Sequence, residues 1–129
     1  KLFIDSISKN NKIILIYPIP EVGFNVKQKI FKDFTFLFKK NNNTQLSIYS
    51  TNYKVFEARN KISFSLLDSF ENSNIFRVYP HKIFCNTLLN NRCIVNDKFN
   101  IFYDDDNHLS QIGSQLLTEK IIKVLDSFK

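Results

Sequence analysis

The alternation of hydrophobic and polar positions along the chain predicts strands separated by helices. The segment 13–17, IILIY, is a continuous apolar run rich in β-branched residues, and Pro18 and Pro20 close it. Such a short run is typical of a strand that is buried on both faces in a parallel sheet. A second run of this kind, 75–79, stops at Pro80. The pattern therefore predicts two buried strands.

Helical patterns surround these two strands. The segment 2–11 fits the end of a helix followed by a turn. The segment 26–43 is ambiguous, because its lysines favour a helix whereas FTFLF alternates as a strand does; we favour a helix that ends before Asn41. Residues 51–70 keep helical spacing, with Ser50 as the expected N-cap. The order strand, helix, strand predicts a right-handed crossover and a parallel sheet covered by helices.

The C-terminal third contains short β-like pieces between residues 85 and 103, followed by a clear helix. Ser110 can cap this helix, and one face carries its apolar residues, which are Ile112, Leu116, Ile121, Leu125 and Phe128. Gly113 in the first turn lowers the stability of the helix by about 1 kcal/mol relative to alanine. Its presence predicts a close approach of another backbone segment at that point.

Length and composition limit the classes of protein to consider. With 129 residues, the chain is at most one domain. Its net charge of +6 comes from scattered lysines without a basic block, so we do not expect it to bind nucleic acid. It contains neither an apolar run long enough for a membrane span nor a signal peptide.

Two observations predict that the sequence is a segment of a longer protein. The chain does not begin with methionine and contains none. Two strands are also too few for a sheet with protected edges, since a doubly wound domain usually has four or five. We therefore expect further strands of the same sheet before Lys1.

The two cysteines, Cys85 and Cys93, flank a polar segment. A separation of this length allows a disulfide, which would indicate an oxidising compartment, but it is equally compatible with two reduced thiols.

Asp105 and His108 are the strongest candidates for chemistry. They are three residues apart on a loop that enters the last helix, where a carboxylate can orient an imidazole and stabilise its protonated form. The alternative is a polar turn that caps the helix. A calcium site on 104–106 is disfavoured because consecutive carboxylates diverge. A zinc site formed by His81, Cys85, Cys93 and His108 matches no compact ligand spacing, and we expect His81 to be an ordinary surface or loop residue.

Three segments carry a resemblance to a known family. They are YPIPEVGFNV at 17–26, YPHKIFC at 79–85 with a second cysteine at Cys93, and YDDDNHLSQIGSQLL at 103–117. In this order they resemble the C-terminal SGNH domain fused to membrane acyltransferases of the acyltransferase-three type, which are similar to bacterial lipopolysaccharide O-antigen O-acetyltransferases. The resemblance covers residues 12–124.

The resemblance implies a fold and a domain organisation. The fold would be the SGNH hydrolase fold, a flavodoxin-like three-layer α/β/α sandwich with a parallel sheet. Residues 1–129 would be the C-terminal part of a single SGNH-type domain whose N-terminal strands are missing from this segment.

The resemblance also implies roles for particular residues. His108 would be the general base that activates a serine, and Asp105 would orient it. Asp104 and Asp106 would be solvated or cap the helix. Glu21 belongs to the matching PIPE segment, but its chemistry suggests no role.

The family's nucleophile lies in a Gly-Asp-Ser block that this chain lacks. Asp5-Ser6 does not replace it, because no glycine precedes it and no strand leads into it. We therefore expect the serine and the oxyanion hole to lie upstream of Lys1, and the segment alone to be inactive.

The implied parent is an O-acyltransferase that transfers an acyl group to sugar hydroxyls of a cell-envelope polysaccharide or glycolipid. We expect this acyl group to be acetyl. An SGNH-type carbohydrate or lipid esterase is the first alternative, and a non-catalytic interaction module from a decayed parent is the second. We expect no cofactor and no metal. The expected partners are an acyl donor, delivered by the parent's membrane domain, and a carbohydrate acceptor. Membrane association would come from the region before this segment, and the domain would be periplasmic or otherwise extracytoplasmic in a bacterial inner-membrane protein.

Overall fold

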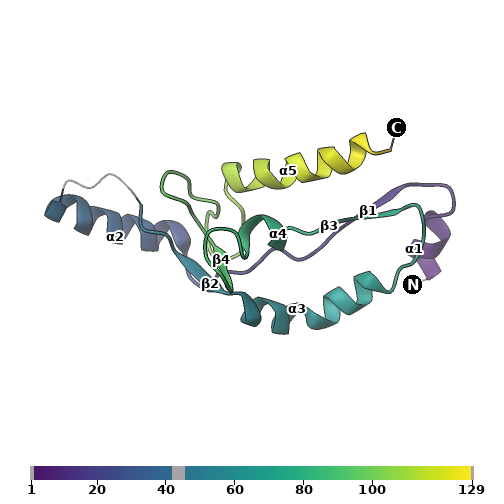
Figure 1. Cartoon of the computed structure of the whole chain (residues 1–129), viewed down its shortest axis with the longest axis horizontal. Helices are drawn as coiled ribbons and strands as arrows, with labels where there is room; N and C mark the ends of the chain where they lie inside the picture. The colour runs from purple at the N-terminus through teal and green to yellow at the C-terminus, as the bar shows by residue number, and fades with distance from the viewer. Residues whose placement is uncertain (1, 42–45, 129) are drawn as a thin grey trace.

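The computed structural model describes residues 2–41 and 46–128 (Figure 1). Its helices are α1 (Leu2–Ile7), α2 (Val26–Asn41), α3 (Tyr53–Asp68), α4 (His81–Phe84) and α5 (Gln111–Asp126), and its strands are β1 (Ile13–Ile16), β2 (Ser50–Asn52), β3 (Ile75–Val78) and β4 (Arg92–Ile94). The predicted order of strand, helix and strand is present in β1, α3 and β3, whereas β2 and α4 were not predicted. None of the described helices is long and apolar enough to cross a membrane.

Strands β1 and β3 form the predicted parallel pair. Ile13 pairs with Ile75, and the register continues to Ile16 and Val78. The expectation that β1 is buried on both faces is wrong for the described residues, because Ile16 is 47% exposed. No described element covers this part of β1, so the apolar run reaches the surface there.

The parallel pair lies between two helical layers, which confirms the predicted three-layer α/β/α arrangement (Figure 1). On one face, Leu15, Tyr17 and Ile75 pack in a cluster that includes Phe64 and Leu67 of α3. On the other face lies α5, and the ring of Phe128, which follows this helix, contacts that of Phe76, with 4.4 Å between the ring centroids. The side chains alternate between the two faces because the strand period is two residues.

Tyr17 connects the layers by hydrogen bonds at the end of β1. Its hydroxyl donates to Asp68 Oδ1 of α3 at 2.5 Å and accepts from Arg77 Nε of β3 at 3.2 Å. The ring is buried, and a buried hydroxyl without partners would be costly. These bonds attach α3 to the sheet at the point where the chain leaves β1 for the segment Pro18–Glu21.

A second, antiparallel pair was not predicted. Ser50 to Asn52 of β2 pair with Ile94 to Arg92 of β4. The expected N-cap of α3 is therefore wrong: Ser50 lies in a strand and accepts a hydrogen bond from Arg92 Nε, and Asn52 caps the helix through the Lys54 amide. Ser50 and Asn52 are both good caps, and only the pairing with β4 selects between them.

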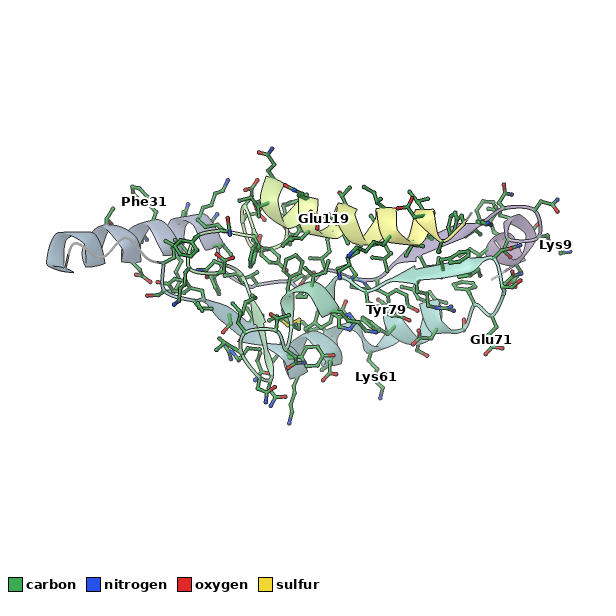
Figure 2. All side chains as sticks on the ribbon, turned by 45° about the horizontal axis from the view of Figure 1, so that its top comes forward. Lys9, Phe31, Lys61, Glu71, Tyr79 and Glu119 are labelled. Carbon is green, nitrogen blue, oxygen red and sulfur yellow. A yellow bond between two sulfur atoms is a disulfide. The ribbon has the colours of Figure 1, made fainter. Side chains whose placement is uncertain are left out.

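The disulfide lies beside this antiparallel pair. Cys85 and Cys93 are bonded to each other, and their backbones form an isolated antiparallel bridge (yellow bond in Figure 2). Helix α4, which was also not predicted, ends immediately before Cys85. The disulfide therefore joins the segment after β3 to β4, which gives the second pair a covalent attachment to the parallel sheet.

Helix α2 confirms the favoured interpretation of residues 26–43. Val26 and Ile30 are buried, whereas Phe31 is exposed. The helix extends through Asn41, one residue further than expected, and Asn42 and Asn43 lie outside the described residues.

Helix α5 begins as predicted. Ser110 Oγ accepts a hydrogen bond from the Gly113 amide at 3.2 Å. The close approach at Gly113 is confirmed, because a Cβ there would lie 2.1 Å from the carbonyl oxygen of Phe102. The predicted apolar face is only partly covered, since Ile112 and Leu125 are 41% and 46% exposed.

Candidate active site

The loop 104–108 carries the Asp-x-x-His pair and is closed by backbone hydrogen bonds. The backbones of Tyr103 and Leu109, which flank the loop, form an isolated antiparallel β-bridge, and the Asp104 amide donates to the His108 carbonyl at 2.8 Å. Phe102 and Tyr103 are buried in the apolar cluster below, together with Val22 and Val26. The loop is therefore a tight, exposed turn whose preceding residues are packed in the core.

Asp105 is held by three hydrogen bonds. Its Oδ1 accepts from the amides of Asn107 at 3.0 Å and His108 at 2.8 Å, and its Oδ2 lies 2.8 Å from His108 Nδ1. A carboxylate can only accept, so the contact requires the proton on Nδ1. This tautomer leaves Nε2 as the basic nitrogen of the neutral ring.

The two groups shift each other's pKa in the directions that a working pair requires. The backbone amides of Asn107 and His108, followed by the imidazole, lower the pKa of Asp105 to about 2. The hydrogen bond and the charge of Asp105 raise the pKa of His108 above its ordinary value. The His108 side chain is 75% exposed, so its Nε2 is open to a reacting group.

The neighbouring aspartates attach the loop to two other segments. Asp104 is exposed, as expected of a solvated side chain, and its Oδ1 lies 2.5 Å from Lys27 Nζ of α2. The Val22 amide donates to the Asp106 carbonyl at 2.7 Å. Only folding brings Lys27 and Val22 to this loop, so the sequence carried no signal for either contact.

The position of the loop relative to the sheet is that expected of a ligand site. Strands β1 and β3 are parallel, so their carboxyl ends lie at the same edge. The segment after β1 reaches the loop through Val22, and the segment after β3 leads into His81. Ligands of open α/β sheets bind at the carboxyl ends of the strands.

Glu21, which had no expected role, lies near Arg59 of α3. Glu21 Oε2 and Arg59 Nη1 are 3.9 Å apart, and both side chains are more than half exposed. At this separation the two side chains form an ion pair but no hydrogen bond.

His81 is not the surface or loop residue that we expected. It is 8% exposed, and its ring lies among those of Phe64, Phe56 and Tyr79, at centroid distances of 5.3, 5.6 and 5.7 Å. Burial lowers its pKa, and its Nδ1 has no hydrogen-bond partner among the described residues. His81 is therefore packed in the interior, whereas the side chain of His108 is exposed.

Two alternative metal sites find no support in the geometry. The disulfide occupies both thiols that a zinc site would need as thiolates. In the part of the chain that the structure describes, no three His, Cys, Asp or Glu side chains are grouped closely enough to hold a metal ion.

Asp5 and Ser6 lie in α1, at the end of the molecule opposite the start of α5 (Figure 1). The structure therefore does not bring Ser6 to His108.

Known proteins resemble this chain in sequence and in fold. A family model described as "SGNH domain (fused to AT3 domains)" matches residues 3–123. Among solved structures, the chain is similar to the periplasmic domain of a lipopolysaccharide acetyltransferase of Salmonella ser. Paratyphi A, with 22% identity and a TM-score of 0.52 over 96% of this chain and 49% of that one. The chain thus spans about half of that domain, and at this identity the likeness shows the fold. No curated protein matches the sequence. Because the family model covers nearly the whole chain, the chain belongs to the family of SGNH domains that are fused to AT3 domains.

Proposed function

We propose that this chain supplies the base half of the active site of an O-acyltransferase. The enzyme would transfer an acyl group, which we take to be acetyl, to a sugar hydroxyl of a cell-envelope polysaccharide or glycolipid. One observation carries the proposal: Asp105 Oδ2 lies 2.8 Å from Nδ1 of an exposed His108. Membership of the family and the likeness to the acetyltransferase domain support it.

His108 performs both proton transfers in the proposed reaction. A serine from the parent's upstream region attacks the carbonyl of the acyl donor, and Nε2 takes the serine proton while Asp105 stabilises the imidazolium. Backbone amides hold the oxyanion, and the leaving group departs with the proton from Nε2. The sugar hydroxyl then attacks the acyl-serine and passes its proton through Nε2 to the serine.

The location and the donor follow from the same proposal. The acyl group would come from the membrane domain of the parent, and this domain would lie on the periplasmic or another extracytoplasmic side. A disulfide between Cys85 and Cys93 is compatible with such an oxidising compartment.

An esterase is the second candidate, and the exposure of His108 favours it. The imidazole is 75% exposed, so water can reach the position of the attacking hydroxyl. Transfer and hydrolysis share the acyl-serine and differ in what attacks it. The ratio of acylated sugar to free acid, measured with the full-length parent, separates the two.

The test of the proposal is His108→Ala in the full-length parent. Transfer of the acyl group should be abolished, because no other described group can serve as the base next to Asp105. Asn107→Ala is the matched control: its backbone amide, which contacts Asp105, is retained, and transfer should continue. Normal acylation by the His108→Ala protein would remove His108 from the mechanism.

The segment alone should not hydrolyse small aryl esters, because the proposed nucleophile lies outside it. Activity that disappears with Ser6→Ala would show that the serine in α1 is the nucleophile after all.

A further inference from the structure

A small cavity of about 130 Å³ lies next to the candidate active site. Glu21, Val22 and Gly23 line one side of it, and residues at the end of β2 and in the first half of α3 line the other. Gly23 has a φ of 78°, which a glycine adopts without strain, so the chain turns at the edge of the cavity.

The cavity connects directly with the loop that carries His108. Val22 lines the cavity, and its amide donates to the Asp106 carbonyl at 2.7 Å. Asp106 lies between Asp105 and His108 in the same turn. A ligand that occupies the cavity and extends along Val22 therefore runs onto the loop of the candidate base.

The charged groups of the cavity are available to a ligand. Glu21 and Arg59 are 63% and 60% exposed, and the 3.9 Å between their charged atoms is too long for a hydrogen bond. Such an exposed, loose ion pair contributes little to stability. Each group therefore keeps its capacity to bind: the carboxylate accepts hydrogen bonds, and the guanidinium donates them.

Two amide side chains complete the polar lining. Asn52 Oδ1 accepts from the Lys54 amide, which leaves its Nδ2 as a donor, and Asn60 Nδ2 donates to the Phe56 carbonyl, which leaves its Oδ1 as an acceptor. No described residue is hydrogen-bonded to these two remaining atoms. Val55 and Phe56 add apolar surface to the same lining.

This combination matches a neutral sugar ring. Each sugar hydroxyl both donates and accepts, so neighbouring hydroxyls need acceptors and donors side by side. The lining carries one negative and one positive group, so a phosphate would meet Glu21 and a cation would meet Arg59. The apolar side chains provide a surface for the C–H groups of the ring.

We propose that this cavity is the acceptor subsite, in which Glu21 and Arg59 bind a neutral sugar residue of the glycan next to the loop of His108. The inference rests on the proposed function for the identity of the glycan as acceptor. It gives the PIPE segment a role in binding rather than in proton transfer.

The first test is a titration of the isotope-labelled chain with neutral monosaccharides, followed by NMR. Glucose, galactose, mannose, rhamnose and N-acetylglucosamine are the neutral probes, and glucose 6-phosphate is the anionic one. At least one neutral sugar should shift the amide signals of Gly23 and Asn60 in a saturable way. No such shift with any neutral sugar, or a shift with the phosphorylated sugar alone, would overturn the proposal.

Charge-removing variants decide whether the two side chains bind the sugar. Glu21→Gln and Arg59→Gln should each raise the Kd roughly tenfold, because each loses a hydrogen bond to a charged group. Lys9→Gln and Glu71→Gln are matched controls at the α1 end of the molecule and should leave the Kd unchanged (Figure 2). Equal affinity in all four variants would refute the assignment.

Acyl transfer by the full-length parent separates this inference from the proposed function. Glu21→Gln and Arg59→Gln should raise KM for the acceptor roughly tenfold, whereas Lys9→Gln and Glu71→Gln should leave it unchanged. An unchanged KM would refute the subsite while the proposed function stands. Sugar binding in the cavity together with normal transfer by His108→Ala would refute the proposed function while the subsite stands.

Discussion

The two histidines of the chain occupy opposite environments. His108 is 75% exposed on a tight turn, where Asp105 raises its pKa. His81 is 8% exposed among aromatic rings, and burial lowers its pKa. The same side chain is thus kept in a basic, accessible form in one region and in a neutral, packed form in the other. Environment rather than residue type decides which imidazole can do chemistry.

The two regions have different roles. The turn at His108 needs few apolar contacts of its own, because Phe102 and Tyr103, which precede it, are anchored in the core. The ring of His81 contributes to the core itself, next to Phe56 and Phe64 of α3. Variants should therefore change reactivity in the first region and stability in the second.

The largest expected effect is that of Asp105→Asn in the full-length parent. We expect kcat for acyl transfer to fall about 10³–10⁴-fold, because the amide no longer enforces the Nδ1 proton or stabilises the imidazolium. The pKa of His108 should fall towards its ordinary value, which an NMR titration of the chain can measure. Asp106→Asn, the neighbouring substitution, should change neither quantity much. A loss of less than tenfold for Asp105→Asn would contradict the assigned role.

His81→Ala should have the largest effect on stability. Removing a buried ring leaves a cavity among aromatic side chains, and we expect the free energy of unfolding to fall by about 2–4 kcal/mol. Denaturant unfolding of the chain measures this change. Ile62→Ala, on the 84% exposed side chain of α3, is the control and should have little effect. A similar loss in both variants would contradict the buried position of His81.

The pH dependence of stability separates the two histidines by sign. Because the pKa of His108 is raised in the folded state, protonation of His108 stabilises the fold at pH values below the pKa of the unfolded state. This contribution is lost as the pH rises through the pKa of the folded state. The lowered pKa of His81 has the opposite effect: stability rises as pH increases from its folded pKa to its unfolded value of about 6.5.

Unfolding measured from about pH 5 to about pH 8 tests these signs. In His108→Asn, the contribution of His81 alone remains, so stability should rise more steeply with pH than in the unmodified chain. An identical pH profile in the two proteins would mean that His108 and Asp105 do not interact in solution.

The smallest expected effect is that of Lys27→Gln, which removes the ion pair with Asp104. Both side chains are about half exposed, so the free energy of unfolding should change by less than about 1 kcal/mol and the change should shrink in high salt. Lys120→Gln on α5 is a control for the loss of one positive charge. A loss above about 2 kcal/mol would show that the pair is essential for the position of the loop.

Long patterns were predictable from the sequence, and short, paired elements were not. The strands β1 and β3 and the helices α3 and α5 follow from apolar runs and helical periodicity within each segment. The strand β2 has three residues and exists because it pairs with β4 from a distant part of the chain. Ser50 therefore reads as a helix cap in isolation and becomes a strand residue only when Arg92 lies beside it.

A buried asparagine shows the same dependence on long-range contacts. The side-chain oxygen of Asn96 accepts from the Tyr49 amide at 2.8 Å, and its nitrogen donates to the Ser47 carbonyl at 2.8 Å. Asparagine in a polar stretch predicts a turn, whereas here it joins two backbone segments in the interior.

The sequence by itself determined the Asp105–His108 contact, because the two residues lie three positions apart and one tight turn is enough to join them. It also determined the cap at Ser110 and the close approach at Gly113, which are local to the start of α5. The tertiary structure alone decided that His81 is buried, that Lys27 reaches Asp104, and that Glu21 and Arg59 line one cavity. These outcomes depend on segments that meet only after the layers pack, so they could not be predicted from local patterns in the sequence.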